Sequence, residues 1–121
     1  MRQLRIVRQQ DGAVVTHQAR IADGFLSRLR GLIGTTEFRE GEGLLFPRCN
    51  SIHMWMMSIP IDAVFLGKCE AGWTVMSTHP ELKPWKLLPV GNRRAVDVLE
   101  LPVGTVNRLK IRNGEVLCIA S

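Results

Sequence analysis

Asp62 is a carboxylate within one of the most apolar stretches of the chain, directly before the Ala-Val-Phe-Leu run at 63–66. An ionised carboxylate buried in such surroundings must receive hydrogen bonds or change its pKa. In one interpretation, Asp62 accepts hydrogen bonds from loop amides or pairs with Arg28, which would fix a helix onto a sheet. In the other, it acts as a general base or contacts a ligand. The structural interpretation is favoured, because buried charges in proteins are usually paired.

His53 is a second candidate for chemistry, since it stands among Ile, Met and Trp residues with Cys49 four positions earlier. Imidazole and thiolate both bind soft metals, but two ligands do not close a zinc site. Four residues of extended strand also place Cys49 and His53 about 13 Å apart, too far for direct proton transfer between a nucleophile and its base. We therefore expect no metal and no cofactor. His53 is expected to be hydrogen-bonded and partly buried, with a role in a pocket as the alternative.

Trp85 and Glu100 complete the set of candidate residues. Trp85 lies within residues 83–89, where prolines on both sides predict an irregular loop, and loops held by a buried aromatic residue often carry function. Glu100 stands between two leucines of a predicted strand, with Arg28 and Arg30 as candidate partners for an ion pair. The predicted ligand-binding residues are therefore His53, Asp62, Trp85, Arg28 and Glu100.

Composition limits the class of protein that could hold these residues. The chain has 121 residues, of which 45% are hydrophobic, enough for one sizeable core, so residues 1–121 are expected to form a single domain. The net charge is +5, and residues 1–30 contain six arginines against two aspartates. Such an excess attracts nucleic acid or anionic surfaces, but these arginines are not interleaved with aromatic residues that would stack on bases. A nucleic-acid partner is therefore disfavoured.

The sequence also predicts where the protein works. Its apolar runs fall well short of the roughly 20 residues that a membrane-spanning helix needs, and its first residues do not resemble a secretory signal. Three cysteines, Cys49, Cys69 and Cys118, cannot all pair within one molecule, and their spacing matches no zinc motif or redox pair. They indicate reduced thiols, so we expect a cytoplasmic protein that makes no membrane contact.

Short strands dominate the elements that must position these residues. Residues 4–10 and 13–18 predict a hairpin around Asp11-Gly12, a dipeptide that accepts a type I′ turn. Apolar residues at helical spacing predict an amphipathic helix from Asp23 to Gly34. A brief helix is expected at 105–109, with Pro102 in its first turn, and a second hairpin-type turn at Asn113-Gly114. Further strands are predicted at 44–46, 51–57, 61–66, 73–77, 95–101 and 115–120.

This pattern predicts a mostly β (α+β) fold: a small antiparallel β-barrel or barrel-like sandwich with one amphipathic helix packed against it. Polar residues that converge with aromatic residues among apolar strands are typical of a binding pocket.

Five segments in this order resemble the prokaryotic family named Domain of Unknown Function 192. They are RLRGLIG at 28–34, GLLF at 43–46, SIHMWMMSIPID at 51–62 followed by VFL at 64–66, LKPWK at 82–86, and VLELPVG at 98–104. The similarity runs from about residue 19 to 119. Two positions depart from the family pattern, Ile33 in place of Met and Glu115 in place of Asp, and both keep the chemistry. The resemblance implies a compact barrel-like domain with one helix, in a family whose function is uncharacterised.

We therefore expect a module that binds a small molecule or a protein partner in a cleft near His53, Asp62 and Trp85. One alternative is a hydrolase-like enzyme that uses Asp62 or His53 as a general base. The other alternative is a nucleic-acid accessory protein that uses the arginine-rich N-terminal region. The sequence leaves open whether the protein is an enzyme.

Overall fold

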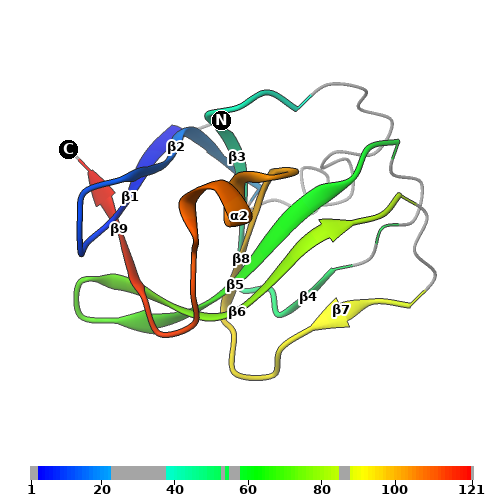
Figure 1. Cartoon of the computed structure of the whole chain (residues 1–121). Coiled ribbons are helices and arrows are strands. Elements are labelled where there is room, and N and C mark those ends of the chain that lie inside the picture. The colour runs from blue at the N-terminus through cyan, green and yellow to red at the C-terminus, as the bar shows by residue number, and fades with distance from the viewer. Residues whose placement is uncertain (1–2, 23–37, 53, 55–57, 85–87, 121) are drawn as a thin grey trace.

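Strands make up most of the computed structural model, which describes residues 3–22, 38–52, 54, 58–84 and 88–120 (Figure 1). The single helix in these ranges, α2, is short and spans Thr105–Leu109. The strands are β1 (Gln3–Arg8), β2 (Val14–Ile21), β3 (Glu42–Pro47), β4 (Ser51–Ile52), β5 (Ile61–Cys69), β6 (Gly72–Leu82), β7 (Val90–Gly91), β8 (Asp97–Pro102) and β9 (Val116–Ala120).

Seven of these strands close into a barrel in the order β1-β2-β3-β8-β5-β6-β9, with β9 returning to β1. The predicted barrel is confirmed, but one of its strand pairs is not antiparallel. β2 and β3 run parallel, with Gln18 opposite Glu42 and Ile21 opposite Leu45. Parallel neighbours need a long crossover connection, and residues 22–41 between these strands provide that length. The barrel is therefore mixed.

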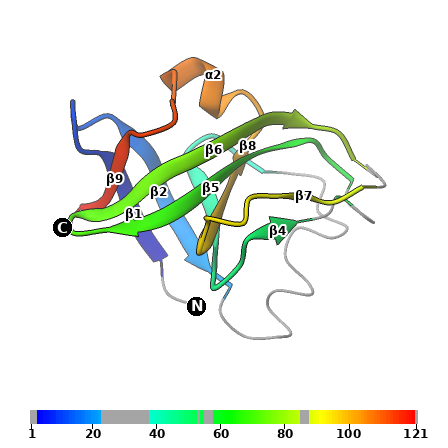
Figure 2. The ribbon, with the colours of Figure 1, turned by 90° about the horizontal axis from the view of Figure 1, so that it is seen from below.

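Two apolar clusters lie on opposite sides of the strands β3, β8 and β5. The inner cluster fills the barrel, and the outer cluster lies between the outside of these strands and the two-stranded sheet β4–β7, which runs beside the barrel in two views (Figures 1 and 2). Strands that are buried on both faces carry continuous apolar runs instead of alternating ones. The outer cluster consists of Ala22, Leu44, Phe46, Ile52, Met54, Ile61, Ala63, Phe65, Leu82, Ala95 and Val98, with Phe38, Cys49, Ile59 and Val90 packed against it.

The helix α2 joins the inner cluster through Val106, and the chain that follows it adds Ile111. The Thr105 hydroxyl donates to the Pro102 carbonyl at 2.7 Å just before the first turn. The predicted helix at 105–109 is confirmed. The expectation that Pro102 begins its first turn is wrong, because Pro102 ends β8 and pairs with Ile61 across the sheet.

The predicted hairpin of β1 and β2 is confirmed, although its turn is wider than a two-residue type I′ turn. Gly12 has a φ of 73°, but Asp11 does not share its positive φ. The Arg8 amide donates to the Ala13 carbonyl and the Gly12 amide to the Arg8 carbonyl, so the loop spans residues 9–12. Asp11 instead accepts from the Ala13 amide, which is the usual role of a short carboxylate in a turn.

Two predicted strands differ from the observed ones. The strand expected at 51–57 ends as β4 at Ile52, and Met54 is buried without strand geometry. Strand β6 continues to Leu82, well past its predicted end at residue 77. The helix predicted at 23–34 lies outside the described residues.

Gly72 closes the seam where β6 meets β9, and its substitution tests the tightness of the barrel. A Cβ on Gly72, whose φ is 152°, would meet the Leu117 carbonyl oxygen at 2.6 Å. We expect Gly72→Ala to lower the free energy of unfolding by about 2–4 kcal/mol, measured by urea denaturation. Gly114→Ala, where the φ is 89° but no atom lies within 4 Å of the new Cβ, is the control and should cost about 1 kcal/mol. Equal losses would contradict a tight seam.

Candidate functional site at the outer face of the barrel

Asp62 points into the barrel and is fully buried. Its two carboxylate oxygens accept backbone hydrogen bonds from opposite directions, one from the Glu81 amide at 2.9 Å and one from the Val106 amide at 2.8 Å. The first bond holds β6 at an irregular register where Glu81 has a φ of 57°, and the second holds the start of α2. Asp62 therefore joins β6 and α2 through backbone amides, a structural role, while its predicted partner Arg28 lies outside the described residues.

Glu100 lies on the opposite face of the sheet, toward the outer cluster. Its cross-strand neighbours are Leu44 on β3 and Ala63 on β5, both members of that cluster. Only 6% of the residue is exposed, and its carboxyl group has no hydrogen-bond or ion-pair partner within the described residues. Burial raises the pKa of Glu100 to about 8, so the group is protonated at neutral pH.

Asp97, a third buried acid, lies on β8 with Glu100 but has several partners. Asp97 accepts from the Trp73 indole at 2.7 Å and the Arg48 amide at 3.0 Å, and its oxygen lies 2.9 Å from the Lys68 ammonium. Burial by itself would raise the pKa of Asp97, but the hydrogen bonds from Lys68 and Trp73 outweigh it and hold this pKa below its usual value. Among the residues that the structure describes, no donor of this kind faces Glu100, which is buried as Asp97 is.

Asp62 and Glu100 do not share one site. The register of β5 and β8 places Asp62 opposite Leu101 and Ala63 opposite Glu100, and neighbouring residues of a strand point to opposite faces. Both acids were predicted to bind a ligand because the sequence shows their apolar neighbours. It does not show which face of the sheet each side chain takes. The other predicted site residues, Arg28, His53 and Trp85, lie outside the described residues.

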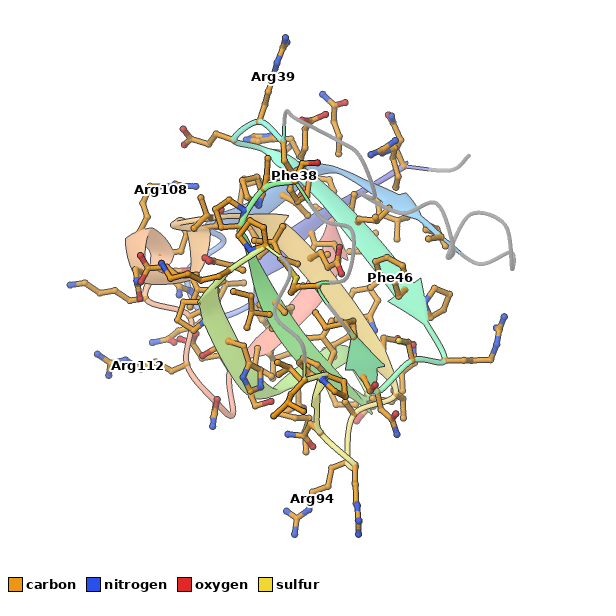
Figure 3. The ribbon with its side chains drawn as sticks, turned by 90° about the vertical axis from the view of Figure 1, so that its right-hand side faces the viewer. Phe38, Arg39, Phe46, Arg94, Arg108 and Arg112 are labelled. Carbon is orange, nitrogen blue, oxygen red and sulfur yellow. The ribbon has the colours of Figure 1, made fainter. Side chains whose placement is uncertain are left out.

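The described segments next to His53 and Trp85 pack against the outer cluster. Ile52 and Met54 on either side of His53 are buried members of it. Leu82 before Trp85 is also a member, and Val90 after it packs against the cluster. Figure 3 looks onto this side of the barrel, with Phe46 on β3 and with Arg94 and Arg112 extending away from the molecule at its edge.

Three polar residues that sequence reasoning did not group lie at the β6 side of the same face. The Ser77 hydroxyl lies 3.2 Å from His79 Nε2, and Asn92 Nδ2 donates to the same hydroxyl at 3.0 Å. The His79 ring packs edge-on against Phe65, with ring centroids 5.2 Å apart, and burial lowers the pKa of His79 below its usual value. Ser77 and His79 are two residues apart in one strand, but the strand was expected to end at residue 77.

One arginine of the arginine-rich N-terminal region, Arg8, forms interactions within the fold. Arg8 bridges Asp11 at 3.0 Å and Glu115 at 3.4 Å, and it donates to the Leu109 carbonyl. The side chain is 11% exposed, so it ties β1 to the turn before β9 and is not presented on the surface.

Neither a metal-binding cluster nor a membrane-spanning helix is found in the part of the chain that the structure describes. Within these residues, no group of three or more His, Cys, Asp or Glu side chains is placed to hold a metal ion. None of the described helices has the length and apolar character needed to span a membrane.

The chain is similar in sequence to proteins of one uncharacterised family. The model of the family Domain of Unknown Function 192, described as an uncharacterised ACR, matches residues 6–119. A UPF0127 protein of Thermococcus sibiricus is 30% identical over 115 residues, covering 91% of this chain and 71% of that protein. A UPF0127 protein of Thermococcus kodakarensis is 27% identical over 116 residues, covering 93% and 71%.

Two solved structures share the fold. One is a protein of Sinorhizobium meliloti named as a candidate transcription regulator, with a TM-score of 0.81 and 24% identity over 97% of this chain and 92% of that chain. The other is a protein of unknown function from Novosphingobium aromaticivorans, with a TM-score of 0.78 and 23% identity over 95% and 82%. At these identities the likeness concerns the fold alone.

Asp62→Asn tests the structural role of Asp62. An amide can accept only one of the two backbone hydrogen bonds, and its NH₂ group would face the other N–H donor. We expect a loss of about 1–3 kcal/mol in the free energy of unfolding, measured by urea denaturation. Glu70→Gln, at an exposed carboxylate in the β5–β6 turn, is the control and should change stability little. Wild-type stability in Asp62→Asn would count against this role.

Glu100 should make stability depend on pH in a defined window. Its pKa is about 8 in the folded protein and near 4.5 when unfolded, so the folded state holds the extra proton between these values. Stability contributed by this group is full below pH 4.5 and is lost as pH rises to 8, by up to about 1.4 kcal/mol per pH unit. The difference in unfolding free energy between wild type and Glu100→Gln, measured at pH 5, 6.5 and 8, should show this slope. A difference that is constant with pH would refute it.

Proposed function

This chain belongs to the family Domain of Unknown Function 192, and we propose that it is a binding protein that holds a small molecule against the outer face of its barrel, with Glu100 as the polar anchor. The observation that carries this proposal is a carboxyl group that is almost fully buried between Leu44 and Ala63 without a described partner. Burial disfavours the ionised form of this carboxyl group, and a ligand that supplies a positive charge or a hydrogen-bond donor would offset this cost.

The chemistry of the surroundings indicates what such a ligand carries. The outer cluster is bordered by the partly buried apolar residues Phe38, Ile59 and Val90, and Glu100 offers a single acceptor or, when protonated, a donor. A ligand with an apolar body and one amine or other hydrogen-bond donor matches this combination. His53 and Trp85 are proposed as further contacts, because the described residues next to them pack on the same cluster.

The structure gives less support to the two competing functions, hydrolysis and nucleic-acid binding. Both oxygens of Asp62 are engaged by backbone amides inside the barrel, which leaves this carboxylate poorly placed to act as a general base. Arg8 is engaged with Asp11 and Glu115, which weakens its part in a surface for nucleic acid. The proposal of a binding site on the outer face therefore has the stronger support.

Binding of three hexyl probes tests this proposal. The full-length chain would be titrated with n-hexylammonium, hexanol and hexanoate, and binding followed by calorimetry and by amide chemical shifts of Leu44, Ala63 and Phe65. We expect hexylammonium to bind most tightly, because the cation pairs with the ionised Glu100. Its affinity should rise by about tenfold per pH unit below pH 8 and level off above it, since binding must first remove the proton.

Glu100→Gln should weaken hexylammonium binding by at least about tenfold and abolish this pH dependence. The control Glu70→Gln should bind as the wild type does. His53→Ala and Trp85→Ala should each weaken binding if these residues contact the ligand. Binding that is equal in Glu100→Gln and wild type, or no binding of any of the three probes, would refute the proposal.

A further inference from the structure

The hydrogen bonds of Asn92 determine which end of its amide faces the Ser77 hydroxyl on β6. The Arg94 amide donates to Asn92 Oδ1 at 2.9 Å, so the other end of the side chain, Nδ2, faces Ser77 and donates to its hydroxyl at 3.0 Å. Ser77 Oγ is thus an acceptor toward Asn92. Ser77 Oγ also lies 3.2 Å from His79 Nε2, and this nitrogen accepts the hydroxyl proton in the tautomer that carries its own proton on Nδ1.

His79 has the properties of a base in this position. Its ring packs edge-on against Phe65 at 5.2 Å, which holds its plane, and its Nε2 atom faces Ser77. Burial lowers the pKa of His79 below its usual value, so the imidazole is neutral at pH 7 and Nε2 can carry a lone pair. A serine whose hydroxyl donates to a neutral imidazole is the arrangement that activates a nucleophile.

The pair is also accessible and has an apolar neighbour. Ser77, His79 and Asn92 are each only partly buried, unlike the fully buried Asp62. Ser77 lies directly opposite Phe65 across β5 and β6, and Phe65 belongs to the outer cluster. Phe65 itself is fully buried, but Val90, two residues before Asn92, is only partly buried and packs against the same cluster, so it offers an apolar contact to a chain attached to a reacting carbonyl group.

We propose that Ser77 and His79 form a nucleophile and general base that transfer the acyl group of a carboxylic ester with an apolar acyl chain. Ser77 Oγ bonds to the carbonyl carbon while its proton passes to His79 Nε2, and the alcohol leaves with that proton. Water then attacks the acyl-serine, its proton passes through His79 to Ser77 Oγ, and the carboxylic acid is released. Asn92 is a positioning residue. The inference uses residues other than Glu100 and does not depend on ligand binding there.

Reaction with an alkyl fluorophosphonate tests this inference on the full-length chain. The probe forms a stable bond with an activated serine, and the labelled peptide identifies which serine has reacted. We expect Ser77 to be labelled about 100-fold faster than Ser51, an exposed serine of β4, because a positioned general base contributes at least about that factor. This comparison is made within one wild-type molecule, so it does not require a variant to fold.

Variants then separate nucleophile from base. Ser77→Ala should remove the fast labelling, His79→Gln should slow labelling of Ser77 by about 100-fold, and the control Ser51→Ala should leave it unchanged. Circular dichroism confirms that each variant is folded. Labelling of Ser77 no faster than that of Ser51, or unchanged in His79→Gln, would overturn the inference. Loss of hexylammonium binding in Glu100→Gln without loss of Ser77 labelling would confirm that the two sites act separately.

Discussion

Burial of β5 and β8 on both of their faces is the constraint on which the rest of this structure depends. These strands form part of the barrel wall and also support the outer cluster, so residues 61–67 and 97–102 are all buried. A polar side chain at any of these positions is removed from bulk water. It must find partners within the protein, remain neutral, or receive a partner from outside.

The three buried acids of these strands meet this constraint in different ways. Asp62 accepts two backbone amides and thereby fixes the β6 irregularity and the start of α2. Asp97 is surrounded by Lys68, Trp73 and the Arg48 amide. Glu100 has neither arrangement within the described residues, and burial leaves it protonated. The first two acids are explained by the fold, whereas for the third we propose a ligand at the outer face.

The sequence predicts the barrel because its strands are short and bounded by turn residues, and because the runs at 63–66 and 98–101 are apolar enough to be buried. It could not predict the parallel pair β2–β3, since nothing in residues 14–21 or 42–47 specifies the direction of their partner. It also grouped Asp62 with Glu100. The face that a side chain takes depends on the register between β5 and β8, which the sequence does not encode locally.

The hydrogen-bonded group of Ser77, His79 and Asn92 was not predicted from the sequence, for a related reason. A strand was predicted at residues 73–77 only, but β6 continues through Pro80 and the positive φ of Glu81 to Leu82. Hydrogen bonding of Asp62 to the Glu81 amide holds the strand through this irregularity. Asn92 lies 15 residues from Ser77 in sequence, and only the hydrogen bond between them in the structure shows that the two meet.

Glu100 is a buried acid with no partner among the described residues, and an NMR titration of its carboxyl group tests this most directly. The side-chain carboxyl carbon of Glu100, assigned by comparison with Glu100→Gln, would be followed from pH 4 to pH 10. We expect the titration of Glu100 to have its midpoint near pH 8, and to shift to lower pH when hexylammonium is added. A midpoint near the ordinary glutamate value of 4.5 would show a carboxylate already paired within the protein, and would contradict the role of Glu100 as the anchor for a ligand.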